Sequence, residues 1–143
     1  MKVISKEWLK ASRDDMLIIE QIINIEHLTH MVAFHAQQAI EKSLKALIEE
    51  YEIDIPKIHK LIRLKKILSD KLTIENDELL ANLDELYIDS RYPGDMGLLP
   101  NGKPTLADAQ EFYDFAKEIF SKVCNIVLIS CFRKWFFTFY LFL

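Results

Sequence analysis

Glycine and proline are concentrated in one short stretch of this 143-residue chain. All three glycines and three of the four prolines lie between Pro93 and Pro104, and the fourth proline is Pro56. Because these residue types most often interrupt helices, the chain has one long irregular loop, one short break and otherwise few interruptions. No turn dipeptide is flanked by alternating apolar residues, so strand signals are weak. The pattern therefore predicts an all-α protein.

Apolar residues recur at helical spacing in five segments. The longest clean pattern runs from His30 to Tyr51, and its apolar arc is broad enough for a central, mostly buried helix. Short connections favour antiparallel neighbours, so we expect an up-and-down bundle of four to five helices. The other helices are expected from Ser5 to Glu26, from Lys57 or Ile58 through Leu72, from a cap at Thr73 or Asn76 to Ser90, and from Thr105, where Thr105 and Asp108 resemble a capping box.

Composition excludes some classes of function. The net charge is −4, which argues against non-specific binding of duplex DNA but leaves room for a local basic groove. The only cysteines, Cys124 and Cys131, are expected to be free thiols. The sequence contains no glycine-rich phosphate loop and no zinc-binding spacing, so we expect neither a metal nor a cofactor. No signal peptide is visible, and the expected location is the cytoplasm.

The C-terminal end differs from the rest of the chain. Residues 126–143 are almost wholly apolar apart from Arg133 and Lys134, so we divide the chain into a helical domain at 1–125 and a hydrophobic extension at 126–143. A basic residue at the centre of a membrane span costs about 2.5–3.5 kcal/mol, which disfavours a simple transmembrane helix. Packing on the core or in a dimer contact is favoured. An origin outside the domain, as after a shifted reading frame, stays open.

A row of polar residues lies beside the apolar arc of the His30–Tyr51 helix. This polar row consists of His35, Gln38, Lys42 and Lys45, whose spacings of three, four and three place them on one helix face. One interpretation is the solvated edge of an amphipathic helix. The other is a binding site for an anion.

Two further positions add polar groups suited to the same chemistry. His59 begins the third helix, and Arg91 and Tyr92 precede the long loop. A guanidinium is a planar fork suited to phosphate or carboxylate, and a tyrosine ring can stack on a base. The structural alternatives are that Arg91 pairs with Asp15 or Glu41, that Tyr92 closes the core and that His59 helps to cap a helix.

The order of these pieces resembles the HEPN domain family, a helical domain often found with nucleotidyltransferases. The resemblance covers about residues 5–125, and the string in the second helix is its most specific part. The matching residues are Trp8, Ala11, Asp15 and Met16, then residues 34–46, then 56–61 and finally 90–93.

The resemblance implies a bundle that is commonly a homodimer, that binds nucleotides or RNA, and that often acts beside a small nucleotidyltransferase in a toxin–antitoxin pair. One large branch of the family consists of metal-independent ribonucleases with an Arg followed four to six residues later by His. Here no histidine follows His59, and Arg13 and Arg63 lack one at that spacing. The acid–base pair is therefore absent as a local motif, and no catalytic residue is assigned.

We therefore expect a binding module for a nucleotide, an RNA end or a nucleotidyltransferase partner. The first alternative is an atypical ribonuclease in which His59 reaches Arg91 in space. The second is a structural dimeric module in which the row's charges pair with acids such as Glu41 or Asp15 and the apolar tail helps to form the interface. In the binding module, phosphate would be met by Lys42, Lys45 and Arg91, a base would stack on Tyr92, and polar contacts would come from His35, Gln38 and His59.

Overall fold

The structure is a computed structural model that describes the backbone of residues 1–89 and 102–140 and the side chains of these ranges up to residue 129. Within these ranges every regular element is helical, which confirms the predicted all-α class with its five α-helices. The elements are α1 (Val3–Ile22), the 3-10 turn η1 (Glu26–Leu28), α2 (Thr29–Glu50), α3 (Leu61–Ile67), α4 (Asp77–Asp89) and α5 (Leu106–Tyr140).

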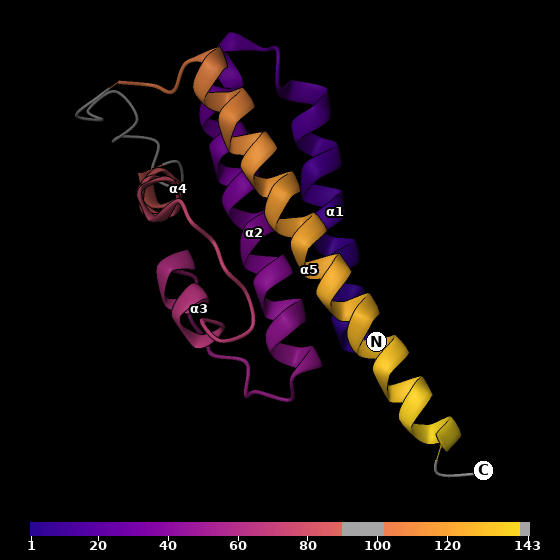
Figure 1. Cartoon of the computed structure of the whole chain (residues 1–143). Helices are drawn as coiled ribbons and strands as arrows, with labels where there is room; N and C mark the ends of the chain where they lie inside the picture. Colours follow the sequence, from indigo (N-terminus) through magenta and orange to yellow (C-terminus); the bar gives the residue numbers. More distant parts are fainter. Residues whose placement is uncertain (90–101, 141–143) are drawn as a thin grey trace.

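Helix α2 lies at the centre of the bundle and packs against each of the other four α-helices. Helices α1 and α2 are antiparallel, and α5 runs beside them in the direction of α2, while the short helices α3 and α4 cover the other side of α2 (Figure 1). The apolar arc predicted on α2 is buried along its length, with Tyr51 half-buried at its end. Burying each large aliphatic side chain of this arc contributes about 1.5–3 kcal/mol, so α2 anchors the core.

Helix α3 is shorter than its apolar pattern predicts. It begins at Leu61 instead of Lys57 or Ile58 and ends at Ile67, although Leu68 and Leu72 are buried as expected. The preceding segment is held outside the helix by tertiary contacts, because Gln37 on α2 donates to the carbonyl of His59 at 2.9 Å. Helix α1 likewise ends at Ile22, before the predicted Glu26.

Helix α5 begins with the predicted capping box. The amide of Asp108 donates to Thr105 Oγ1 at 3.1 Å, and the amide of Thr105 donates to Asp108 Oδ2 at 2.8 Å. Together these bonds satisfy two amides that the first helical turn leaves free. Further along the helix, Cys124 is a half-buried free thiol, and burial raises the pKa of this group.

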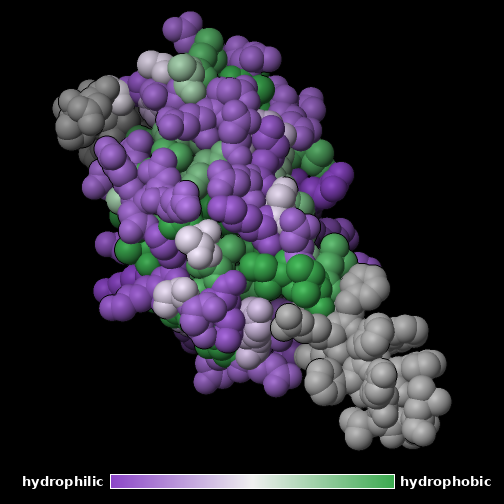
Figure 2. All heavy atoms as spheres, viewed as in Figure 1, coloured by the Kyte–Doolittle hydropathy of each residue, from purple (hydrophilic) through white to green (hydrophobic). Residues whose placement is uncertain are grey.

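Helix α5 continues without a break through the predicted boundary between residues 125 and 126. The division into a helical domain and a hydrophobic extension stays a prediction. Val127 is buried, whereas Leu128 and Ile129 are 50% and 56% exposed. The face of the bundle shown in Figure 2 is mostly hydrophilic, with a hydrophobic patch (green) at the lower right, next to the grey atoms. None of the helices in the described ranges has an apolar stretch long enough to cross a membrane.

Candidate functional site

Two carboxylates organise the polar row, and the first belongs to Asp15 of α1. One of its oxygens lies 2.8 Å from His35 Nδ1, and the other accepts a hydrogen bond from Lys42 Nζ at 2.5 Å. The Asp15 side chain is only 8% exposed, whereas that of Lys42 is 25% exposed. Because Asp15 comes from a neighbouring helix, it fixes the histidine and the lysine together at the junction of α1 and α2.

The second carboxylate, Glu41, lies on α2 itself. Its Oε1 accepts a hydrogen bond from Lys45 Nζ at 2.8 Å and lies 3.0 Å from His59 Nδ1. The amides of Gln37 and Gln38 donate to its Oε2, each at 3.3 Å. The side chains of Glu41 and Lys45 are 6% and 8% exposed, while that of His59 is 61% exposed. Glu41 therefore joins a buried ammonium to an imidazole that faces solvent.

Buried polar contacts also hold the segment that carries His59. Gln37 donates from Nε2 to the His59 carbonyl, and its side-chain oxygen accepts from Gln38 at 2.8 Å. Asp84 of α4 accepts from the amide of Leu61 at 2.9 Å and so caps α3. Burial raises the pKa of Asp84 despite this bond. These contacts fix where α3 begins and, with it, the position of His59.

The basic members of the polar row are all paired. Two ammonium groups, those of Lys42 and Lys45, face two carboxylates, and each carboxylate also holds one imidazole. When both imidazoles are neutral, the two positive charges of the lysines and the two negative charges of the carboxylates cancel. The row is therefore a salt-linked network and not an open stripe of cations. This pairing with Asp15 and Glu41 is the arrangement that the structural alternative predicts.

Two of the predicted site residues, Arg91 and Tyr92, lie outside the described residues. The predicted approach of Arg91 to Lys42, and its approach to His59 in the ribonuclease alternative, therefore stay predictions. The C-terminal end of α4, which precedes Arg91 and Tyr92 in the sequence, lies beside the polar row. The ring of Tyr87 stacks on Phe34 with the centroids 5.3 Å apart, and Phe34 in turn makes an edge contact with His35 at 5.2 Å.

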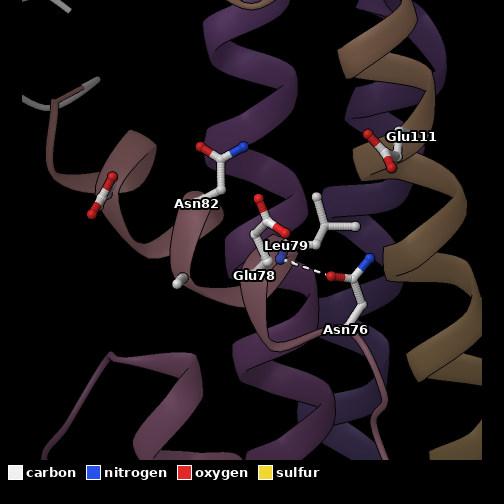
Figure 3. Close-up of a pocket in the computed structure, with 7 residues that line it drawn as sticks. Asn76, Glu78, Leu79, Asn82 and Glu111 are labelled. Carbon is white, nitrogen blue, oxygen red and sulfur yellow. Dashed lines mark hydrogen bonds between the residues drawn. The ribbon is translucent and has the colours of Figure 1, made fainter. Parts of the chain in front are cut away.

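A cavity of about 530 Å³ lies elsewhere, between α4 and α5 (Figure 3). Asn76, the predicted cap of α4, accepts from the amide of Leu79 at 3.0 Å on its wall. The lining carries carboxylates and no basic residue, so it is unsuited to a phosphate group. The lining residues are Asn76, Glu78, Leu79, Ala81, Asn82, Glu85 and Glu111.

The sequence indicated Asp15 and Glu41 as acids that could pair with the row, but not which cation each of them holds. Glu41 stands four residues before Lys45, a spacing that brings a carboxylate and an ammonium together on a helix, so this pair had a local signal. The pairs that Asp15 and Asp84 make join residues 20 or more positions apart, and no local pattern indicates them.

The site is thus a partly buried polar network on the central helix of an all-α bundle, in which two ammonium groups pair with two carboxylates. The chain belongs to the HEPN domain family, because the model of the HEPN domain matches residues 5–127. This match confirms the resemblance in the sequence. No curated protein matches the chain.

Two solved structures are similar to this chain. The crystal structure of TT1696 from Thermus thermophilus has 26% identity and a TM-score of 0.71, covering 85% of this chain and 97% of that one. The crystal structure of ST0689, an archaeal HEPN homologue, has 22% identity and a TM-score of 0.62, covering 89% of this chain and 99% of that one. The second likeness concerns the fold alone.

Proposed function

We propose that this HEPN-family protein is a binding module for a phosphate-bearing ligand, either a nucleotide or the end of an RNA strand. The observation that carries the proposal is the fixed orientation of the polar row and of His59. Asp15 holds His35 and Lys42, and Glu41 holds His59 at the surface of the bundle. A site that is oriented before the ligand arrives loses less conformational entropy on binding.

The paired groups keep hydrogen-bonding capacity for a ligand. An ammonium has three N–H donors, and Asp15 engages only one oxygen of its carboxylate with Lys42, so donors remain on this quarter-exposed side chain. His59 directs Nδ1 to the Glu41 carboxylate, so its Nε2 accepts from a base edge when the imidazole is neutral and donates to a phosphate oxygen when the imidazole is protonated. Lys45 is buried on Glu41, and we assign it to holding that carboxylate instead of meeting phosphate.

We propose that Arg91 and Tyr92 belong to the same site. The stacking of Tyr87 on Phe34 puts the end of α4 next to His35, and the chain leaves α4 at Asp89, two residues before Arg91. Because Asp15 and Glu41 offset the charges of Lys42 and Lys45, the guanidinium of Arg91 would supply the net positive charge that a phosphate needs. Tyr92 would then stack on the base.

Family membership supports a wider proposal about partners. We propose that the protein is a cytoplasmic homodimer that acts beside a nucleotidyltransferase in a toxin–antitoxin-like pair. Light scattering on the purified chain tests the dimer, with a mass near twice the 16.8 kDa of one chain expected and a monomer contradicting it. Co-expression with a nucleotidyltransferase encoded by a neighbouring gene tests the partner, and failure to co-purify contradicts it.

Calorimetric titration with nucleotides and short RNAs tests the binding site. We expect Lys42→Gln and His59→Ala each to weaken binding about tenfold, because each removes a hydrogen bond to a charged group. Lys66→Gln is the matched control, since Lys66 is exposed on α3 and is not part of the network. Absence of binding to the wild type, or equal affinity in Lys42→Gln and Lys66→Gln, contradicts the proposal.

A structural role is the second candidate, and the complete pairing of the row favours it. In that case the network fixes the packing of α1, α2 and α3 and meets no ligand. Variants of the row would then lower the free energy of unfolding, and neither nucleotides nor RNA would stabilise the wild type. Thermal unfolding with and without ligand separates the two candidates, because only a ligand that binds the native state raises Tm.

A further inference from the structure

Another pocket, with a lining of both polar and apolar side chains, lies on another part of the bundle, between α1 and α5. These two helices pack side by side on α2 (Figure 1). The cavity between them has a volume of about 180 Å³. Its lining comes from two turns of α1 and one turn of α5, and consists of Arg13, Met16, Leu17, Glu20, Tyr113 and Lys117.

Glu20, the carboxylate in this lining, and Lys117 already have partners. Glu20 accepts a hydrogen bond from the hydroxyl of Tyr113, and burial together with this bond raises the pKa of Tyr113 to about 12. The hydroxyl therefore stays a donor at neutral pH. Lys117 Nζ lies 3.1 Å from Asp114 and 4.3 Å from the centroid of the Tyr113 ring. The wall formed by α5 is thus ordered and nearly charge-balanced.

Arg13 is the exception at this pocket. In the part of the chain that the structure describes, its guanidinium has neither a hydrogen-bond partner nor an ion-pair partner. Its charge nevertheless acts on the neighbouring helix, because it opposes the burial that raises the pKa of Cys124. A planar guanidinium without a carboxylate partner is suited to bind an oxyanion through two parallel hydrogen bonds.

Size and charge limit the ligand. Pockets for drug-sized ligands usually measure about 300–1,000 Å³, so this one accommodates only a small molecule and excludes a nucleotide. Met16 is buried and Leu17 is 45% exposed, and with the Tyr113 ring they form an apolar surface for a hydrocarbon group. Glu20 in the same lining repels a second negative charge, which favours a carboxylate over a phosphate dianion.

We propose that the α1–α5 pocket binds the carboxylate of a small organic acid that has a single ring or a short branched chain. Arg13 binds the carboxylate, and the hydrocarbon group lies against Met16, Leu17 and the Tyr113 ring. This site goes beyond the proposed function, because it lies on α1 and α5 and is too small for a nucleotide. A loss of nucleotide binding would leave it unaffected.

Methyl NMR on the full chain tests the pocket with benzoate as the probe. We expect saturable shifts of the Met16 and Leu17 methyl signals at millimolar benzoate, while Met31 on α2 serves as the internal reference. Benzyl alcohol, which keeps the ring without the charge, and acetate, which keeps the charge without the ring, are each expected to bind more weakly.

Arg13→Gln is expected to weaken benzoate binding at least about tenfold, because a hydrogen-bonded charge pair is lost. Arg63→Gln is the matched control, since Arg63 is an exposed arginine on α3, away from the pocket. Both substitutions are at exposed positions, so the fold is expected to persist. Absence of saturation, equal binding of benzoate and benzyl alcohol, or equal affinity in the two arginine variants overturns the proposal.

Discussion

The buried pair of Glu41 and Lys45 should couple strongly in a double-mutant cycle. Both side chains are less than a tenth exposed, and the ammonium lies 2.8 Å from the carboxylate. Glu41→Gln removes the counter-charge of a buried ammonium, which is expected to cost about 3 kcal/mol of unfolding free energy. The ring of Trp8, whose centroid lies 5.6 Å from Lys45 Nζ, and the flexibility of lysine offset part of this cost.

The cycle combines Glu41→Gln with Lys45→Met and follows urea unfolding by circular dichroism. Glu41→Gln leaves the Lys45 ammonium buried without its counter-charge, and Lys45→Met removes that ammonium. The loss of unfolding free energy in the double variant should therefore be about 2 kcal/mol smaller than the sum of the losses in the two single variants. The exposed pair of Glu118 and Lys122 has the same spacing and is the matched control, with a coupling of about 0.5 kcal/mol expected. Equal coupling in the two cycles refutes the argument.

Further predictions concern the ends of helices. Asp84→Ala removes the cap of α3 and is expected to cost about 1–2 kcal/mol, with faster hydrogen exchange confined to α3; uniform acceleration contradicts this. Burial raises the pKa of Asp84 in the folded state above its unfolded value, so its contribution to stability is greatest below the unfolded pKa and falls as pH rises through the folded pKa. Asp84→Asn should therefore flatten the dependence of the unfolding free energy on pH in this range, and an unchanged dependence contradicts this. Thr105→Ala breaks the capping box of α5 and should lower Tm by about 4 °C, whereas no change contradicts the box. Gly102 has φ +71° with no atom within 4 Å of the position that an added methyl group would occupy, so Gly102→Ala should cost about 1 kcal/mol through backbone strain alone, and unchanged stability in urea contradicts this.

Sequence periodicity correctly predicted the elements that are specified by residues close together in the chain. Helix α2 has a long apolar arc, and its predicted bounds of His30 and Tyr51 each lie one residue from those observed. The capping box at Thr105 is local and was predicted correctly. Helix α3 was predicted too long, because its first turn depends on Asp84, 23 residues away from Leu61. Local spacing carries no information about such a contact.

The same distinction applies to the candidate site. The spacing of the polar row places its members on one face, but the partners of that face come partly from α1 and from the segment before α3. The structural alternative named Asp15 and Glu41 as acids able to pair with the row, and the structure shows both pairings. Which cation each acid would hold depended on how α1 and α3 dock on α2, and no local pattern specifies that docking.

Nitrogen NMR of the histidine rings tests the proposed binding site most directly. The chain has four histidines, of which His35 and His59 belong to the network, while His27 in η1 and His30 in the first turn of α2 serve as internal references. During titration with a short RNA that carries a terminal phosphate, we expect saturable shifts of the His59 and His35 ring signals and stationary His27 and His30 signals. Stationary signals from all four rings, or equal shifts in all four, would contradict the proposed site.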